Sequence, residues 1–81
     1  IMEPFVITLP KKPKRRTFYQ HEGQEILFVL EGTMRFFHGS EEYIVEEGDC
    51  VYFDSSLPHF GETSGDREVK CFMVIFSPDN R

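Results

Sequence analysis

Two histidines and a glutamate are the residues of this chain best suited to chemistry. His21 and Glu25 are four positions apart, and His59 follows a second short apolar run. Two imidazole nitrogens and a carboxylate oxygen form the facial arrangement that binds non-haem iron in an open site, and zinc, manganese or nickel accept the same donors. The sequence therefore predicts a divalent metal site (Fe, Zn, Mn or Ni) at His21, Glu25 and His59.

The spacing also favours convergence of the first two ligands with Tyr19. Tyr19, His21 and Glu25 differ by even numbers, and alternate side chains of a strand point to the same face. On one continuous strand all three would lie together, although Gly23 is a position where a bulge would shift the register. Without a metal, the histidines and the glutamate would hydrogen-bond to one another, with Tyr19 capping them, and would orient an organic ligand.

Six short segments have the composition of strands. They are rich in β-branched and aromatic residues, alternate with period two, and are separated by turn signals such as Gly39-Ser40 and Glu47-Gly48. No window has the apolar spacing of a helix. The predicted strands are 5–9, 25–30, 33–38, 42–46, 50–54 and 68–76. Strands at this spacing predict an all-β fold, a small sandwich or barrel of antiparallel hairpins.

The register of these hairpins predicts a binding pocket. A two-residue turn at Glu31-Gly32 would pair segment 25–30 with segment 33–38 and place Glu25 opposite His38, which would then offer a fourth nitrogen. One face is then mostly apolar with polar groups at one end, as in small-molecule sites. That face holds Glu25, Leu27, Val29, Met34, Phe36, His38, Tyr43 and Val45, and we expect Tyr19, Leu27, Met34, Phe36 and Tyr43 to contact the ligand.

The opposite face of these strands is apolar as well. It carries Ile26, Phe28, Leu30, Phe37 and Ile44, whereas a half-exposed antiparallel sheet has polar residues there. We therefore expect a second sheet or another subunit to cover it. Self-association would also suit a chain of 81 residues, because a domain of this size buries only about 60–70% of its unfolded surface.

We expect residues 1–81 to form one domain and, because the chain opens with Ile1-Met2, to be part of a longer polypeptide. The net charge is −5, and five of the nine basic residues lie between Lys11 and Arg16. The remaining body lacks the basic face that nucleic acid requires, so we expect no direct contact with nucleic acid. We interpret the basic cluster as a solvated loop.

The two cysteines point to a reducing compartment. Cys50 and Cys71 each lie in an apolar, strand-like run, which predicts two small buried hydrophobes rather than a disulfide. No apolar stretch approaches the ~18 residues of a membrane span, and nothing resembles a signal peptide. We therefore expect no contact with a membrane and a cytoplasmic location.

Taken together, these motifs resemble those of the cupins, which are small β-barrels of the jelly-roll class. The first cupin motif is His, any residue, His, three or four residues, Glu, six residues, Gly, and this chain has Tyr19, His21, Glu25 and Gly32 at those positions. The second is Gly, five residues, Pro, any residue, Gly, two residues, His, three residues, Asn, where this chain has Gly48, Asp54, Ser56, His59 and Thr63. The match extends over residues 3–77.

The resemblance implies an antiparallel jelly-roll barrel, the double-stranded β-helix. In metal-binding cupins three histidines and one glutamate hold the ion, and the first of those histidines is Tyr19 here. A phenol with a pKa near ~10 seldom binds a divalent ion at neutral pH. The implied site is therefore reduced to His21, Glu25 and His59, which favours ligand binding over catalysis.

The chain looks most similar to the cupin domains at the C-terminal end of helix-turn-helix (XRE-type) transcriptional regulators, through segments 21–25, 28–32 and 52–59. That similarity implies a module that binds a small molecule, forms a homodimer and reaches DNA only through a fused domain. One alternative is a small metal-dependent enzyme, of the dioxygenase or isomerase type, that uses His21, Glu25 and His59. Another is a structural domain whose outer apolar sheet is the functional surface.

Overall fold

The computed structural model describes residues 1–11 and 16–78, and this part of the chain folds into seven antiparallel strands. The strands are β1 (Met2–Leu9), β2 (Gln24–Glu31), β3 (Met34–His38), β4 (Glu41–Val45), β5 (Cys50–Asp54), β6 (His59–Thr63) and β7 (Val69–Phe76). The prediction of an all-β jelly roll is thus confirmed. No helix in the described ranges is long and apolar enough to cross a membrane.

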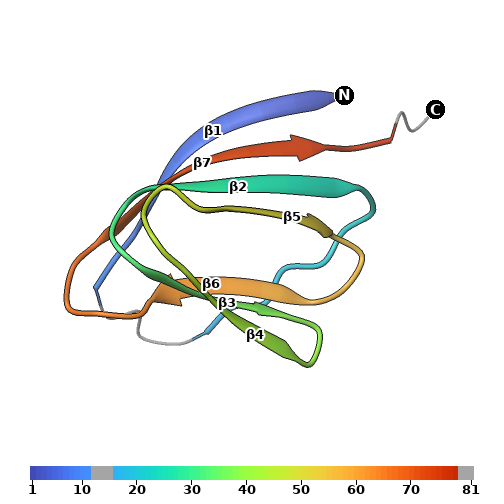
Figure 1. The fold of residues 1–81 in the computed structure, drawn as a ribbon. Coiled ribbons are helices and arrows are strands. Elements are labelled where there is room, and N and C mark those ends of the chain that lie inside the picture. Colours follow the sequence, from blue (N-terminus) through green and yellow to red (C-terminus); the bar gives the residue numbers. More distant parts are fainter. Residues whose placement is uncertain (12–15, 79–81) are drawn as a thin grey trace.

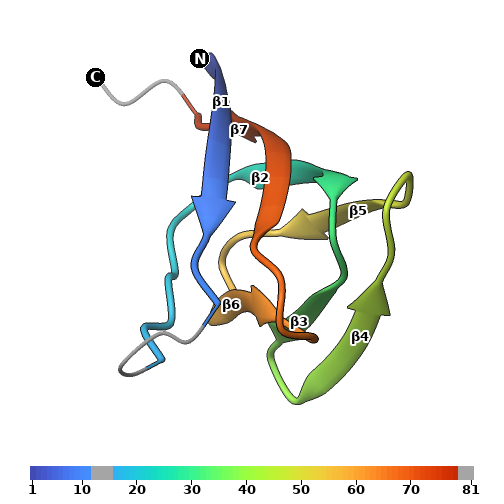
Figure 2. The ribbon, with the colours of Figure 1, turned by 90° about the vertical axis from the view of Figure 1, so that its left-hand side faces the viewer.

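The strands form two sheets that face each other. The four-stranded sheet has the order β1-β7-β2-β5, and the three-stranded sheet has the order β4-β3-β6. The two layers lie one above the other in Figure 1, and the view along the sandwich in Figure 2 shows the space between them. A pocket and the hydrophobic core share this space, so every strand has one face directed inward.

The chain passes from one sheet to the other at Gly32, and the predicted hairpin of segments 25–30 and 33–38 is wrong. Both edges of β2 are already occupied, by β7 and by β5. Gly32 has a φ of +88°, and a Cβ atom there would lie 2.7 Å from the carbonyl oxygen of Glu68, so only glycine suits this crossing. Leu27 and Phe36 therefore belong to different sheets and face each other across the core.

His38 is consequently far from the position predicted for it. It lies opposite His59 in the β3–β6 register, and its Nε2 is 2.8 Å from the carbonyl oxygen of Asp54. Glu25 instead lies opposite Phe53 of β5 and Ile75 of β7. The proposed role of His38 as a fourth metal ligand is therefore wrong.

The hairpin of β3 and β4 places Phe36 opposite Tyr43 and Met34 opposite Val45, so these four residues share one face as predicted. The sequence analysis missed β6, which pairs with β3. In β6 both His59 and Phe60 are buried and Gly61 follows, so neither alternation nor composition marks a strand. A Cβ atom on Gly61 would lie 2.9 Å from the Sδ atom of Met34.

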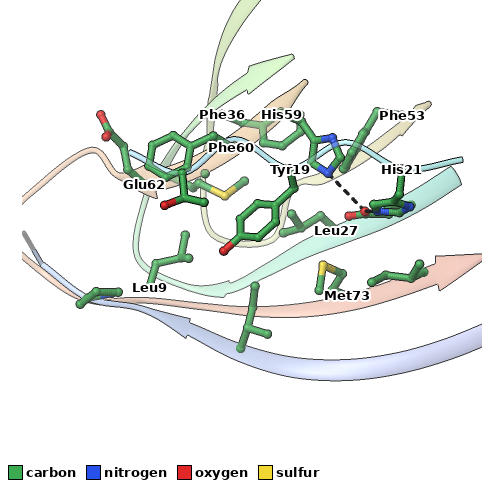
Figure 3. A pocket seen from close by; sticks show the side chains of 17 residues that line it. Leu9, Tyr19, His21, Leu27, Phe36, Phe53, His59, Phe60, Glu62 and Met73 are labelled. Carbon is green, nitrogen blue, oxygen red and sulfur yellow. Dashed lines mark hydrogen bonds and ion pairs between the residues drawn. The ribbon is translucent and has the colours of Figure 1, made fainter. Parts of the chain in front are cut away.

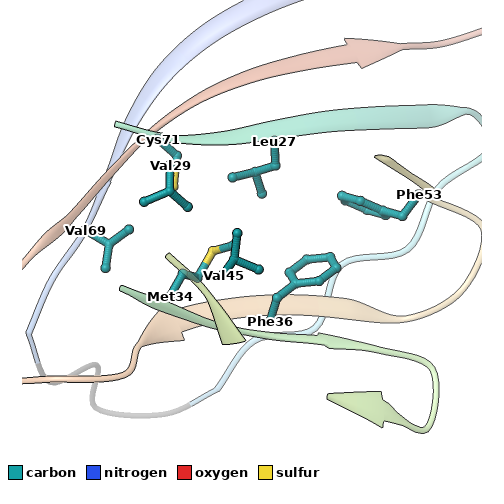
Figure 4. Packing of buried hydrophobic residues seen from close by; sticks show 8 residues of the cluster. All are labelled: Leu27, Val29, Met34, Phe36, Val45, Phe53, Val69 and Cys71. Carbon is teal, nitrogen blue, oxygen red and sulfur yellow. The ribbon is translucent and has the colours of Figure 1, made fainter. Parts of the chain in front are cut away.

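A cluster of buried apolar side chains joins the two sheets (Figure 4). Its members are Leu27, Val29, Met34, Phe36, Val45, Phe53, Val69 and Cys71. Burying a side chain of Val, Leu, Phe or Met stabilises a fold by about 1.5–3 kcal/mol. Because the cluster draws on five strands, its burial holds the two sheets together. It extends as far as the histidines, since the ring centroids of Phe53 and His59 are 4.9 Å apart.

Both cysteines are free thiols. Cys71 is fully buried, as predicted, and burial raises its pKa to about 11. Cys50 is exposed, so the prediction of burial is wrong for this residue. Its side chain projects from the outer face of β5, because the inward positions of that strand are Val51 and Phe53.

Candidate metal centre

Three side chains that can bind a metal meet at one end of the space between the sheets. The Nε2 atom of His21 is 2.6 Å from Oε1 of Glu25, and the Nε2 atom of His59 is 3.3 Å from the same oxygen. The ligand atoms of all three residues lie within 4.8 Å of one another. Figure 3 shows the rings of His21 and His59 turned toward this point. The predicted grouping of His21, Glu25 and His59 is confirmed.

The three ligands come from different parts of the fold and not from one continuous strand. Glu25 lies on β2 of the four-stranded sheet and His59 begins β6 of the three-stranded sheet. His21 belongs to neither strand, because β2 begins at Gln24. The even spacing of Tyr19, His21 and Glu25 on one strand is therefore not what brings them together. The ligands converge because the chain passes from one sheet to the other between His21 and Glu25.

Backbone hydrogen bonds fix the position of the segment that carries His21. Tyr19 and His59 exchange two of them, of 2.8 and 2.9 Å, and the amide of His21 donates to the carbonyl of Ser55 at 2.9 Å. The chain then turns at Gly23, which has a φ of +127°; a Cβ atom there would lie 2.2 Å from the carbonyl oxygen of Phe76. A glycine is therefore required between His21 and Glu25.

Each histidine is oriented by a hydrogen bond on the far side of its ring. The Nδ1 atom of His59 is 2.9 Å from the carbonyl oxygen of Leu57, and that of His21 is 3.3 Å from the carbonyl oxygen of Glu22. A carbonyl oxygen only accepts, so both Nδ1 atoms carry the proton. In the neutral rings both Nε2 atoms then present lone pairs to the carboxylate of Glu25. The two Nε2 atoms and Oε1 of Glu25 thus surround a position that is favourable for a cation.

Ser55 is a residue of this centre that the sequence analysis missed. Its hydroxyl donates to Oε1 of Glu25 at 3.2 Å, and its side chain is completely buried. Ser55 lies in a turn at the end of β5, where Oδ1 of Asp54 accepts a hydrogen bond from the amide of Ser56 at 2.9 Å. That hydrogen bond lowers the pKa of the Asp54 carboxyl. The pairing of β2 with β5 would have revealed Ser55, since Phe53 lies opposite Glu25.

Two of the three ligands are buried, and the third is partly exposed. The side chains of Glu25 and His59 are 4% and 7% exposed, whereas that of His21 is 36% exposed. A buried carboxylate is costly unless it is paired, so the two histidines and Ser55 are needed to hold Glu25. The exposed side of His21 leaves the centre accessible from the adjoining pocket and from solvent.

A pocket of about 570 Å³ adjoins the centre, within the range of sites for small organic molecules. Its walls are apolar and come from both sheets, with Leu27 and Met73 on one side and Phe36 and Phe60 on the other (Figure 3). Besides the centre itself, the polar side chains that line it are Thr17, Tyr19 and Glu62. The Tyr19 hydroxyl points into the pocket and away from both histidines in Figure 3.

Four of the five residues expected to contact a ligand line this pocket: Tyr19, Leu27, Met34 and Phe36. Tyr43 does not line it. It faces the same side of the sheet as Phe36, but β4 is the edge strand and leaves the Tyr43 side chain 45% exposed. The predicted wall contained only segments 25–30, 33–38 and 42–46, so it lacked the contributions of β1 and β7, among them Ile7, Leu9 and Ile75.

The basic cluster falls mostly outside the described residues, because 12–15 are not among them. Arg16 is described and forms a bidentate pair with Glu62, with Nε–Oε1 and Nη2–Oε2 distances of 3.0 and 2.9 Å. Its guanidinium also lies 4.8 Å from the ring centroid of Phe37. Arg16 is thus held against the three-stranded sheet, which anchors the start of the segment that carries Tyr19 and His21.

Fold and site together define a class of protein, the small jelly-roll barrels with a histidine and carboxylate centre inside. The sequence matches the model of the cupin domain over residues 5–75. The chain therefore belongs to the cupin family. A search of the curated proteins found no match.

Similar solved structures include metal-containing enzymes. HppE with Fe(II) and the alternative substrate (S)-1-HPP has a TM-score of 0.81 and 28% identity, covering 93% of this chain and 42% of that one. HppE with Co(II) and Tris buffer has a TM-score of 0.82 and 28% identity, covering 93% and 45%. Hydroxypropylphosphonic acid epoxidase from S. wedmorenis has a TM-score of 0.81 and 28% identity, covering 93% and 43%. This chain thus spans less than half the length of these proteins.

Proposed function

We propose that this cupin domain binds a divalent first-row metal ion at His21, Glu25 and His59 and receives a small molecule with an apolar body in the adjoining pocket. One observation carries the proposal: two imidazoles, each donating its Nδ1–H to a backbone carbonyl, direct Nε2 at one carboxylate oxygen. A proton or a metal ion satisfies that arrangement, and the donor set is that of an open two-histidine, one-carboxylate site.

The distances support an ion of ordinary size. Bonds of about 2.0–2.2 Å to nitrogen and oxygen place neighbouring ligand atoms roughly 3 Å apart, and the two distances to Oε1 of Glu25 are 2.6 and 3.3 Å. His21 lies on a segment outside the strands and is partly exposed, so it is the ligand best able to move by the small amount required. The similarity to Fe(II) and Co(II) structures of HppE also supports a divalent ion.

The residues around the centre have distinct tasks. Glu25 supplies the negative charge, Ser55 holds one of its oxygens, and the carbonyl of Leu57 fixes the tautomer of His59. A divalent ion bound there would act as a Lewis acid toward a ligand oxygen or, if it is iron, would activate oxygen. The apolar walls exclude water from one side of the centre and favour a ligand whose polar group is directed toward the histidines.

A metal titration with a matched control tests the proposal. We expect protein purified without chelator to contain one divalent ion per chain, and His59→Ala to weaken zinc or Fe(II) binding by about 100-fold or more in calorimetry. His38→Ala is the control, because His38 is a neighbouring histidine that binds a backbone carbonyl instead of Glu25. Equal affinity of the two variants, or no binding by the unmodified protein, would refute the metal site.

The regulatory role suggested by the sequence is a second proposal. The apolar pocket and the presence of Tyr19 in place of a fourth metal ligand support a domain that senses a small molecule for a transcriptional regulator, with DNA contacted by a fused helix-turn-helix domain. Free thiols support the cytoplasm as its location. A thermal-shift screen of metabolites distinguishes the two roles: stabilisation without turnover supports a sensor, and turnover without a stabilising effector supports a dioxygenase or isomerase.

A further inference from the structure

The segment that connects the two sheets ahead of β2 forms one side of the pocket. We call residues 16–21 the strap. The strap lies along β6, an edge strand of the three-stranded sheet, where Tyr19 pairs with His59 in a single antiparallel bridge. In Figure 2 the strap runs in light blue from the level of β6 up to β2. Because its backbone is paired at Tyr19 and again at His21, the strap extends the wall of the three-stranded sheet toward the four-stranded sheet.

The even-numbered side chains of the strap attach it to its surroundings. The ring centroid of Phe18 is 5.5 Å from that of Phe60, and Nε2 of Gln20 donates to the carbonyl oxygen of Ser56 at 2.8 Å. Arg16 forms the bidentate ion pair described above. These contacts hold the strap from one side, so its other side can face the pocket.

The odd-numbered side chains of the strap all line the pocket. They are Thr17, Tyr19 and His21, as alternation along an extended segment requires. The strap therefore presents two hydroxyls and an imidazole in a row. The remaining wall is mostly apolar and includes Ile7, Leu27, Ile75 and Met73 from one sheet and Met34, Phe36 and Phe60 from the other. A ligand in this pocket thus meets polar groups at the centre and along the strap, and apolar groups elsewhere.

The hydroxyl of Tyr19 is available to a ligand. It points into the pocket, and no hydrogen bond connects it to the other residues drawn in Figure 3. The hydroxyl of Tyr52, on the outside of the four-stranded sheet, instead donates to Oε1 of Gln24 at 2.6 Å. A phenol both donates and accepts, so Tyr19 can bind either a hydroxyl or a carbonyl group. Because Tyr19 is 59% exposed, a ligand beside it would add to its contacts.

The spacing along the strap sets the length of such a ligand. Alternate residues of an extended chain are about 7 Å apart, and Tyr19 directs its hydroxyl away from His21 (Figure 3). A ligand that reaches both the centre and this hydroxyl is therefore at least as long as a benzene ring with a substituent at each end. The walls suit an aromatic ring, because aromatic rings and thioethers pack favourably against one. The aromatic and thioether side chains of the walls are Phe36, Phe53, Phe60, Met34 and Met73.

We propose that the pocket takes an aromatic acid with a hydrogen-bonding substituent at the far end of its ring, and that Tyr19 determines this specificity. The acid group lies at the centre, where a divalent ion bound by one carboxylate and two neutral histidines leaves an excess positive charge. The ring packs against Leu27 and Met73, and its substituent hydrogen-bonds to the hydroxyl of Tyr19. This inference rests on the proposed function, because it names the class of small molecule that the same pocket receives.

Matched acids test the role of Tyr19. The probes are benzoate, phenylacetate and phenylpropanoate, each as its para-hydroxy and its para-methyl derivative, titrated by calorimetry into protein whose zinc content has been measured. The two derivatives of one acid have similar size, but only the first can hydrogen-bond. For the acid of matching length we expect the para-hydroxy derivative to bind the unmodified protein about 3–10-fold more tightly, as one neutral hydrogen bond allows.

Two conservative variants complete the experiment. Tyr19→Phe keeps the ring and removes only the hydroxyl, so the preference for the para-hydroxy derivative should disappear. Tyr52→Phe is the matched control, because it removes a hydroxyl outside the pocket and should leave the preference unchanged. A preference that persists in Tyr19→Phe, or that both variants lose equally, would overturn the inference.

The zinc content separates the remaining outcomes. If the unmodified protein holds zinc but shows no preference within any pair, or binds none of the acids, the inference is overturned while the metal centre stands. If the unmodified protein holds no zinc, the proposed function fails and the inference fails with it.

Discussion

The Glu25→Gln variant should be more stable than the unmodified protein without metal and less stable than the unmodified protein with metal. In the metal-free chain the Glu25 carboxylate is buried, with one hydroxyl donor from Ser55 and two Nε2 atoms facing it. A glutamine has the same shape and loses the buried charge. The two Nε2 atoms and the Ser55 hydroxyl all contact Oε1, so an amide nitrogen at that position has two hydrogens to donate to the two Nε2 atoms, at the cost of the Ser55 hydrogen bond. Metal-free Glu25→Gln should therefore be more stable than the unmodified protein.

The magnitude follows from the cost of the buried carboxylate. Removing an incompletely satisfied buried charge in favour of a neutral group of equal volume stabilises a protein by about 1 kcal/mol or more. For a domain of this size that raises the Tm by about 4–8 °C. With zinc at about 100 times its Kd, the unmodified protein gains about 2.7 kcal/mol, or roughly 10–20 °C. Glu25→Gln, which keeps only the two histidines, should gain far less and become the less stable of the two.

Differential scanning fluorimetry with EDTA and with added zinc measures both effects. Glu62→Gln is the control, since Glu62 is the other carboxylate of the pocket but pairs with Arg16. Glu62→Gln should lose the stabilisation from the ion pair with Arg16 but show the same rise in Tm with zinc as the unmodified protein. If Glu25→Gln is destabilised in EDTA and still gains as much from zinc as the unmodified protein, Glu25 is a structural acceptor and the argument from the donor set is wrong.

Three further predictions concern the fold that holds the centre. Phe36→Ala should lower the free energy of unfolding by about 3–5 kcal/mol in urea titrations, because the ring is 1% exposed between the sheets; a loss below ~1 kcal/mol would contradict this packing. Gly23→Ala should weaken zinc binding and lower the Tm together, because its Cβ would collide with the Phe76 carbonyl; unchanged affinity would show that the turn does not position His21. At pH 8 and low protein concentration, iodoacetamide should modify Cys50 but not Cys71, whose pKa of about 11 keeps it a thiol; mass spectrometry of two modified residues in folded protein would contradict the burial of Cys71.

The strands and the site could be predicted from the sequence to different extents. Alternation of apolar residues located six of the seven strands, because those strands have one inward face. It missed β6, where two successive residues are buried and a glycine sits opposite Phe36. The ligands His21, Glu25 and His59 could also be predicted, since the chain has only three histidines and two of them follow the spacing of the cupin motifs.

The pairing of the strands could not be predicted locally. A turn at Glu31-Gly32 is equally compatible with a hairpin and with a crossing between sheets. The choice depends on β5 and β7, which begin only at Cys50 and Val69 and occupy both edges of β2. The same long-range pairing decides that Ser55 reaches Glu25 and that Tyr43 stays outside the pocket. These positions follow from the assembled sheets rather than from any segment alone.

The origin of the ligands in both layers has a consequence for motion. Glu25 belongs to one sheet and His59 to the other, and they meet between the two sheets beside Phe53 of the hydrophobic core. An ion bound by both residues would hold the two sheets together at this point. Its release would let the sheets move relative to each other while each sheet keeps its own hydrogen bonds. Metal occupancy would thereby control how wide the pocket can open. A ligand in the pocket would then respond to the ion through the separation of the two sheets as well as through direct contact.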